Sequence, residues 1–228
     1  MKSWSIPKAG ARFVAKMEDV LDVYQRPYDP ECPQVCLDEI SKTLHATPRG
    51  AFPLEPGKPR REDYEYERHG QCALFLAVEP LRGFRQVWVS PRRTKLDFAQ
   101  VLKELVDKMY PEARKVVLVT DNLNIHHAAC LYERFPAAEA RRIAAKIEWH
   151  YTPEHASWLN IAECELSVLR RQCLKSRVAD IETLIAQVDA WQRQRNEKQI
   201  GIDWRFTTED ARIKLRRLYP IVKVQDLN

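Results

Sequence analysis

The pattern of apolar and polar positions predicts a chain that alternates between helices and strands. Residues 9 to 25 carry apolar side chains at the spacing of an amphipathic helix, which Arg26 and Pro27 end. The apolar run from 35 to 40 predicts a short buried strand that finishes in acidic residues. The segment 46 to 68 is rich in proline and arginine and predicts a long excursion before the next strand.

The same alternation continues through the middle of the chain. Residues 72 to 78 and 84 to 89 predict the two strands of an antiparallel hairpin. A helix is expected over 94 to 110, with Thr94 as its N-cap. The run 115 to 120 is the strongest strand signal, and its β-branched residues favour a place at the centre of the sheet.

The last third of the chain predicts one more strand and several helices. The strand covers 147 to 151, and the helices are expected at 127 to 134, 137 to 146, 159 to 173, 180 to 198 and 207 to 217. This order predicts an α/β fold: a mixed sheet with a β-hairpin, flanked by helices. We expect an N-terminal helix and connector (1–34), a core domain (35–178) and C-terminal helices that pack on the core (179–228).

The composition of the chain excludes several classes of protein. The chain has 228 residues, of which 45% are hydrophobic and 30% are charged, as in ordinary globular proteins. We find no apolar run long enough to span a membrane and no secretory signal, so we expect a cytoplasmic protein with reduced cysteines. The net charge of +5 and recurring arginine doublets fit a nucleic-acid binder or, equally, a solvated surface. No glycine-rich phosphate loop or zinc-ligand spacing is present.

Acidic residues near predicted strand ends are the candidate chemistry. Asp121 follows the strongest strand, where a carboxylate would point into the crevice beyond the sheet, or would instead cap the next helix. Of the neighbours Asp38 and Glu39, only one can face such a site, because adjacent strand residues point to opposite faces. Glu163 and Glu165 pose the same choice on a helix, and the other one should be solvated or paired with an arginine. Three carboxylates from separate elements would suit Mg²⁺ and phosphodiester chemistry.

Three segments together resemble a known family. They are Leu37-Asp38-Glu39, the run from Thr120-Asp121-Asn122 to His126, and the run from Thr152-Pro153 through Ser157-Trp158-Leu159-Asn160 to Glu163. In combination they resemble the catalytic core of DDE transposases. The match is closest to the insertion-sequence-630 family, bacterial relatives of the mariner-type elements.

The resemblance implies a role for each acid. It selects Asp38, Asp121 and Glu163 as catalytic residues and metal ligands, with two Mg²⁺ or Mn²⁺ ions in an RNase H-like fold. It implies cut-and-paste transposition, in which DNA is cleaved at the transposon terminal repeats and joined to target DNA, typically at TA. The partners would be double-stranded DNA and a second copy of the chain on that DNA, in a bacterial cytoplasm, associated with the nucleoid when bound.

The sequence also departs from that family. Only 37 residues precede Asp38, too few for the family's helix-turn-helix region. A separate helix-turn-helix chain is therefore a further expected partner, and the gene could be split or truncated. Two other readings stay open: a non-catalytic DNA-binding remnant or assembly protein that retains the fold, and an RNase H-like nuclease without transposition.

Other residues could support the acids or contact DNA. Asn122, Asn124 and His126 could orient Asp121 or touch a phosphate, although turn chemistry explains them equally well. Before Glu163 lie His155, Trp158, which we expect to be a buried anchor rather than a DNA contact, and Asn160, a helix cap or a metal-site neighbour. The expected DNA-binding cations are Lys58, Arg60, Arg61, Arg92 and Arg93.

Overall fold

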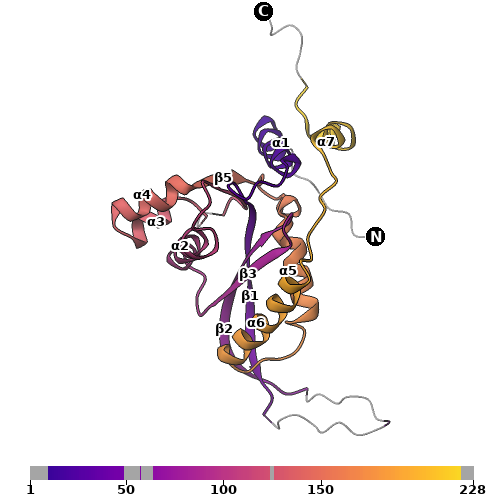
Figure 1. The fold of residues 1–228 in the computed structure, drawn as a ribbon. Coiled ribbons are helices and arrows are strands. Elements are labelled where there is room, and N and C mark those ends of the chain that lie inside the picture. The colour runs from indigo at the N-terminus through magenta and orange to yellow at the C-terminus, as the bar shows by residue number, and fades with distance from the viewer. Residues whose placement is uncertain (1–9, 49–56, 58–63, 124–125, 222–228) are drawn as a thin grey trace, which may run out of the picture.

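The computed structural model describes residues 10–48, 57, 64–123 and 126–221. The strands in these residues form one sheet with the order β3-β2-β1-β4-β5 (Figure 1). They are β1 (Gln34–Ala46), β2 (Glu67–Glu79), β3 (Phe84–Ser90), β4 (Val116–Thr120) and β5 (Ile147–Tyr151). The α-helices are α1 (Ala11–Gln25), α2 (Lys95–Glu104), α3 (Ala129–Arg134), α4 (Ala137–Lys146), α5 (Ile161–Gln172), α6 (Ile181–Glu197) and α7 (Thr208–Lys214).

The sheet is mixed, as the sequence predicts. β1 pairs with β2, and β2 with β3, in antiparallel fashion, so the hairpin expectation is confirmed. β4 pairs in parallel with β1 on one side and with β5 on the other. The parallel pairing of β1 with β4 covers only Gln34–Cys36, because β4 ends at Thr120 while β1 continues to Ala46. Beyond Cys36 the sheet therefore opens between these two strands.

Two expectations about the strands are wrong. Asp38 does not end its strand but lies inside β1, which runs well past the predicted end at Ile40. Residues 41 to 46 lack the apolar pattern of a strand and are held in β1 by their antiparallel pairing with β2. β4 is an interior strand but not the central one, which is β1.

Helices cover both faces of the sheet. Apolar residues of α2, α3 and α4 pack on one face, together with Leu37 of β1. Residues of α1, α5, α6 and α7 pack on the other face, where Cys36 and Ile40 of β1 point. This alternation follows from the two-residue period of a strand. Figure 1 shows the two helical layers on opposite sides of the sheet.

Local signals explain where several helices begin and end. Thr94 and Asp97 form a capping box at the start of α2, and the last predicted turn of that helix is a π-helix, Leu105–Met109. α4 and β5 have the predicted bounds. α5 begins two residues later than predicted, because Ser157–Leu159 form a 3₁₀ turn before it.

A buried ion network fixes α5 against its neighbours. Glu165 of α5, whose side chain is 1% exposed, accepts two hydrogen bonds from Arg195 of α6, at 2.6 and 2.9 Å. Its Oε1 also lies 3.0 Å from Nε of Arg85 in β3, which is fully buried. The side-chain oxygen of Asn196 accepts a hydrogen bond from the guanidinium of the same arginine, at 3.2 Å. The expectation that one of Glu163 and Glu165 pairs with an arginine is confirmed for Glu165.

We predict that Glu165→Gln strongly destabilises the fold. The substitution leaves two buried guanidinium groups without a counter-charge, which costs about 3–5 kcal/mol in comparable buried pairs. Urea unfolding measures the change. Arg205→Ala removes the exposed pair of Arg205 with Asp203 and should leave the midpoint unchanged. A loss no larger for Glu165→Gln than for Arg205→Ala would contradict the prediction.

Candidate active site

The opening of the sheet places two carboxylates side by side. The last paired residues of the two strands are Cys36 and Val119. Two positions further along, the strands carry Asp38 and Asp121. Because side chains alternate between faces, Asp38 has the orientation of Cys36, toward the layer that contains α5, whereas Asp121 follows the end of β4 and its carboxylate contacts His126. Asp38 is 6% exposed, and the side chain of Asp121 is 22% exposed.

The third acid, Glu163, lies in the first turn of α5. Asn160 caps this helix by accepting a hydrogen bond from the backbone of Ala162, at 3.1 Å. Its side-chain nitrogen donates to the carbonyl of Leu37, the residue before Asp38, at 3.0 Å. One buried asparagine thus ties the start of the helix to β1 beside Asp38.

A tyrosine of α1 supports the same helix start. The hydroxyl of Tyr24 donates to the carbonyl of Leu159 at 2.7 Å and accepts from the backbone of Ile161 at 3.3 Å. Sequence reasoning missed this residue, since its place in the apolar stripe of α1 carries no sign of the contact. Together, Tyr24 and Asn160 fix where Glu163 enters the site.

The electrostatics of Asp38 show that the acids share one environment. Burial, as the largest cause, and the negative charges of Asp121, Glu39 and Glu163 together raise the pKa of Asp38 to about 7. A hydrogen bond from the backbone of Glu39, at 2.8 Å, partly offsets this rise in the pKa. The carboxylates therefore repel one another when all are ionised.

His126 bridges two acids from inside the protein. Its Nδ1 donates to a carboxylate oxygen of Asp121, and its Nε2 forms an ion pair with Glu39 at 2.9 Å. The ring packs against Phe98 of α2, with 4.4 Å between ring centroids. Burial lowers the pKa of His126, but the two carboxylates outweigh it and raise the pKa to about 9. His126 is thus a buried cation that holds Asp121.

The donor set suits a divalent cation, but its present arrangement does not enclose one. Carboxylates from β1, from the end of β4 and from α5 are the hard oxygen ligands that Mg²⁺ and Mn²⁺ prefer. Within the described residues, however, no three His, Cys, Asp or Glu side chains converge closely enough to hold a metal ion. Asp121 is engaged by His126 instead. A shared ion would require these side chains to rearrange.

Comparison with known proteins identifies the family. The sequence pattern of the DDE superfamily endonucleases matches residues 33–185, about two thirds of the chain. The chain belongs to this family. A search among curated proteins finds no match.

Solved structures show that this DDE endonuclease chain has an RNase H-like fold. A Mos1 mariner paired-end complex with Mn superposes with a TM-score of 0.54 and 15% identity. The Mos1 transposase paired-end complex with the left transposon end gives 0.52 and 16%. In both comparisons 88% of this chain is covered, whereas it spans only 63% and 65% of the Mos1 chain.

The supporting residues that the sequence predicts have mixed outcomes. Asn160 is the predicted helix cap. Trp158 is 45% exposed, so the expectation of a buried anchor is wrong: its ring meets Phe206 edge-on and otherwise faces solvent. His155 is exposed on the turn before α5. Asn122 is half-buried, and its side chain makes no hydrogen bond among the described residues. Asn124 lies outside the described residues.

The predicted DNA-binding cations lie in two segments. Lys58, Arg60 and Arg61 fall outside the described residues. Arg92 and Arg93 are exposed on the loop between β3 and α2. Arg93 lies 3.5 Å from Glu39, a residue that the sequence offered only as a rival to Asp38. The contact of Glu39 with His126 had no signal in the sequence.

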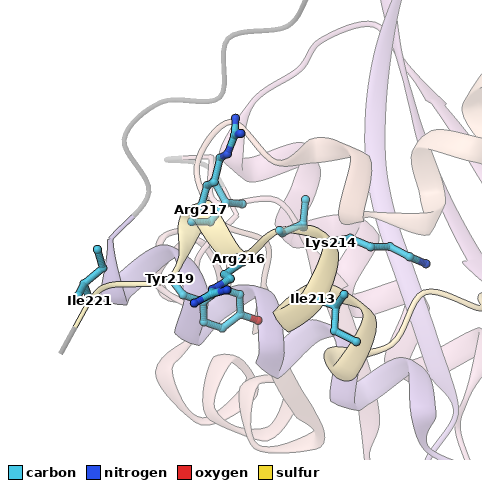
Figure 2. A pocket seen from close by; sticks show the side chains of 8 residues that line it. Ile213, Lys214, Arg216, Arg217, Tyr219 and Ile221 are labelled. Carbon is cyan, nitrogen blue, oxygen red and sulfur yellow. The ribbon is translucent and has the colours of Figure 1, made fainter.

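A recess elsewhere on the protein lacks acids. It has a volume of about 750 Å³ and is formed by α7 and the turn that follows it. Figure 2 shows Lys214, Arg216, Arg217 and exposed isoleucines around it. No carboxylate lines this recess, so it does not compete with Asp38, Asp121 and Glu163 as a metal centre. Separately, none of the helices among the described residues is long and apolar enough to cross a membrane.

We predict that Asp38→Asn stabilises the metal-free protein more strongly at pH 8 than at pH 5. The folded pKa of about 7 exceeds the ordinary 3.8, so the folded state binds more protons between these values. Stability therefore falls as the pH rises from about 4 to 7, by an amount on the order of 2–4 kcal/mol. Thermal unfolding in EDTA measures it, with exposed Asp203→Asn as control. A lower Tm for Asp38→Asn at both pH values would refute the expectation.

Proposed function

We propose that this chain is the catalytic domain of a DNA transposase, with Asp38, Asp121 and Glu163 as its catalytic acids. One observation carries the proposal: the opening between β1 and β4 and the capped start of α5 bring these three acids into one electrostatic environment. Membership of the DDE superfamily endonucleases supports it. On the resemblance of its motifs, we further propose a relative of the bacterial insertion-sequence-630 family.

We propose that the same acids hold Mg²⁺ or Mn²⁺. A bound divalent ion would activate the attacking oxygen and stabilise charge on the phosphate and the leaving oxygen. Two of the similar Mos1 structures are complexes with Mn and with Mg. In this chain, His126 holds Asp121, and Asn160 fixes the helix that carries Glu163. The contact of Asn160 keeps the start of that helix in place for ion binding, whereas Asp121 would have to turn away from His126 to join a shared ion.

The proposed partners follow from the similar structures. They contain Mos1 as a paired-end complex, one of them with the left transposon end. For this chain we propose transposon terminal repeats and a TA target as DNA substrates, and a dimer on that DNA. Because the chain spans less than two thirds of the Mos1 chain, we also propose that a helix-turn-helix segment outside this sequence reads the repeats.

One observation favours a second candidate function. The acids of the described residues do not yet form a metal cage. A DNA-binding or assembly protein that keeps the fold without catalysis would show that arrangement permanently. Metal binding and strand transfer separate the two candidates.

Divalent ions should stabilise the folded protein. We expect Mn²⁺ or Mg²⁺ to raise the Tm, because a bound cation relieves the repulsion among the carboxylates and binds only the folded state. Asp121→Asn should abolish most of this rise, while Glu154→Gln, an exposed acid on the turn before α5, should retain it. An equal rise in both variants would count against the site.

The decisive assay is cleavage and strand transfer on a labelled duplex that carries the element's own terminal repeats. In Mn²⁺ we expect joined products, lost by at least a hundredfold in Asp38→Ala, Asp121→Ala and Glu163→Ala, because each removes a proposed metal ligand (on the order of 3 kcal/mol in the barrier). Glu154→Gln is the matched control. Cleavage without joining would indicate a nuclease, and metal binding without either reaction would indicate the non-catalytic candidate.

A further inference from the structure

A second, polar recess lies beside the open part of the sheet. It has a volume of about 350 Å³ and lies between the middle of β1, the first half of β2 and the loop from β3 to α2. Its polar side chains are those of Ser41, Gln71, Arg92 and Arg93. All four residues are exposed. None of them belongs to the proposed metal centre.

The recess offers hydrogen-bond donors that the protein itself does not use. In the described residues, no carboxylate pairs with the guanidinium of Arg92, and no hydrogen bond engages the side chains of Ser41 or Gln71. Arg93 is half exposed and reaches only one oxygen of Glu39, at 3.5 Å. No acidic side chain lines the recess. Two arginine forks with neutral donors beside them are a donor set that suits a phosphate group.

The position of the recess relates it to the three acids. Ser41 lies three residues beyond Asp38 on β1, roughly 10 Å along the strand, and on the face of Glu39, opposite that of Asp38. This part of β1 has no β4 neighbour, and Ser41 is exposed, whereas further along the strand the backbone of His45 donates to the carbonyl of Val178. Arg93 also contacts Glu39, whose second oxygen pairs with His126, the residue that holds Asp121.

We propose that this recess binds a backbone phosphate of duplex DNA whose reacting bond lies at the acids. The inference rests on the proposed function, because it takes DNA as the substrate. Phosphate contacts of this kind fix the position of a duplex without reading its sequence. Arg92 supplies the principal contact, since its charge has no acidic partner in the described residues, while Arg93 divides its charge between the phosphate and Glu39.

Fluorescence anisotropy of a labelled duplex of mixed sequence, in EDTA, tests the recess without any cleavage. Arg92→Ala should weaken binding about three- to tenfold and lower the slope of log affinity against log salt by about one, as expected for one lost phosphate contact. Arg92→Lys should keep the slope, because it keeps the charge. Arg141→Ala is the matched control: an exposed arginine on α4 that also has no acidic partner in the described residues. Thermal unfolding verifies that each variant is folded.

Several results would overturn the inference. One is equal affinity and salt slope for Arg92→Ala and Arg141→Ala, and another is failure of the wild-type chain to bind the duplex. Inorganic phosphate at matched ionic strength should displace the duplex less effectively from Arg92→Ala than from wild type. Equal displacement would mean that the phosphate competes at a site outside the recess. A chain that binds through Arg92 but never cleaves DNA keeps this inference while the proposed catalysis fails. Intact cleavage with unaltered binding in Arg92→Ala overturns the inference alone.

Discussion

The unequal length of β1 and β4 is the constraint on which the candidate site depends. Where their pairing stops, backbone groups of β1 lose a strand partner, and buried peptide groups need another one. The carbonyl of Leu37 accepts from Asn160, and the amide of Glu39 donates to the carboxylate of Asp38. The same opening that makes room for a substrate therefore recruits the polar side chains that order the site.

Charge is arranged so that this opening can carry several buried acids. Glu39 and Asp121 lie on either side of the His126 cation, whereas Asp38 has no cationic partner among the described residues and its pKa rises. Burying a charge without a partner is costly, so Asp38 weakens the metal-free fold. On the far side of α5, Glu165 and its two arginines prevent the helix from rotating. The site that contains the unpaired Asp38 is thus held in place by a helix whose buried Glu165 is paired.

Most helices and strands could be predicted from the sequence, because the spacing of their apolar residues is unambiguous. The prediction failed for the second half of β1, where strand geometry is imposed by pairing with β2 and not by the residues themselves. Asp121 could be selected from its strand, but the choice of Asp38 over Glu39 needed a family resemblance. The structure supplies a physical reason for that choice, since Asp38 shares the face of Cys36 and Ile40. The contact of His126 with Glu39, and the exposure of Trp158, depend on distant segments that no local pattern encodes.

The two faces of β1 consequently have different roles in one site. Asp38 points toward α5 and Glu163, whereas Glu39 points toward α2, where it meets His126 and Arg93. Charges of alternating sign then run from Arg93 through Glu39 and His126 to Asp121. A phosphate that drew Arg93 away from Glu39 would leave Glu39 with His126 alone, and so would strengthen the hold of Glu39 on that cation.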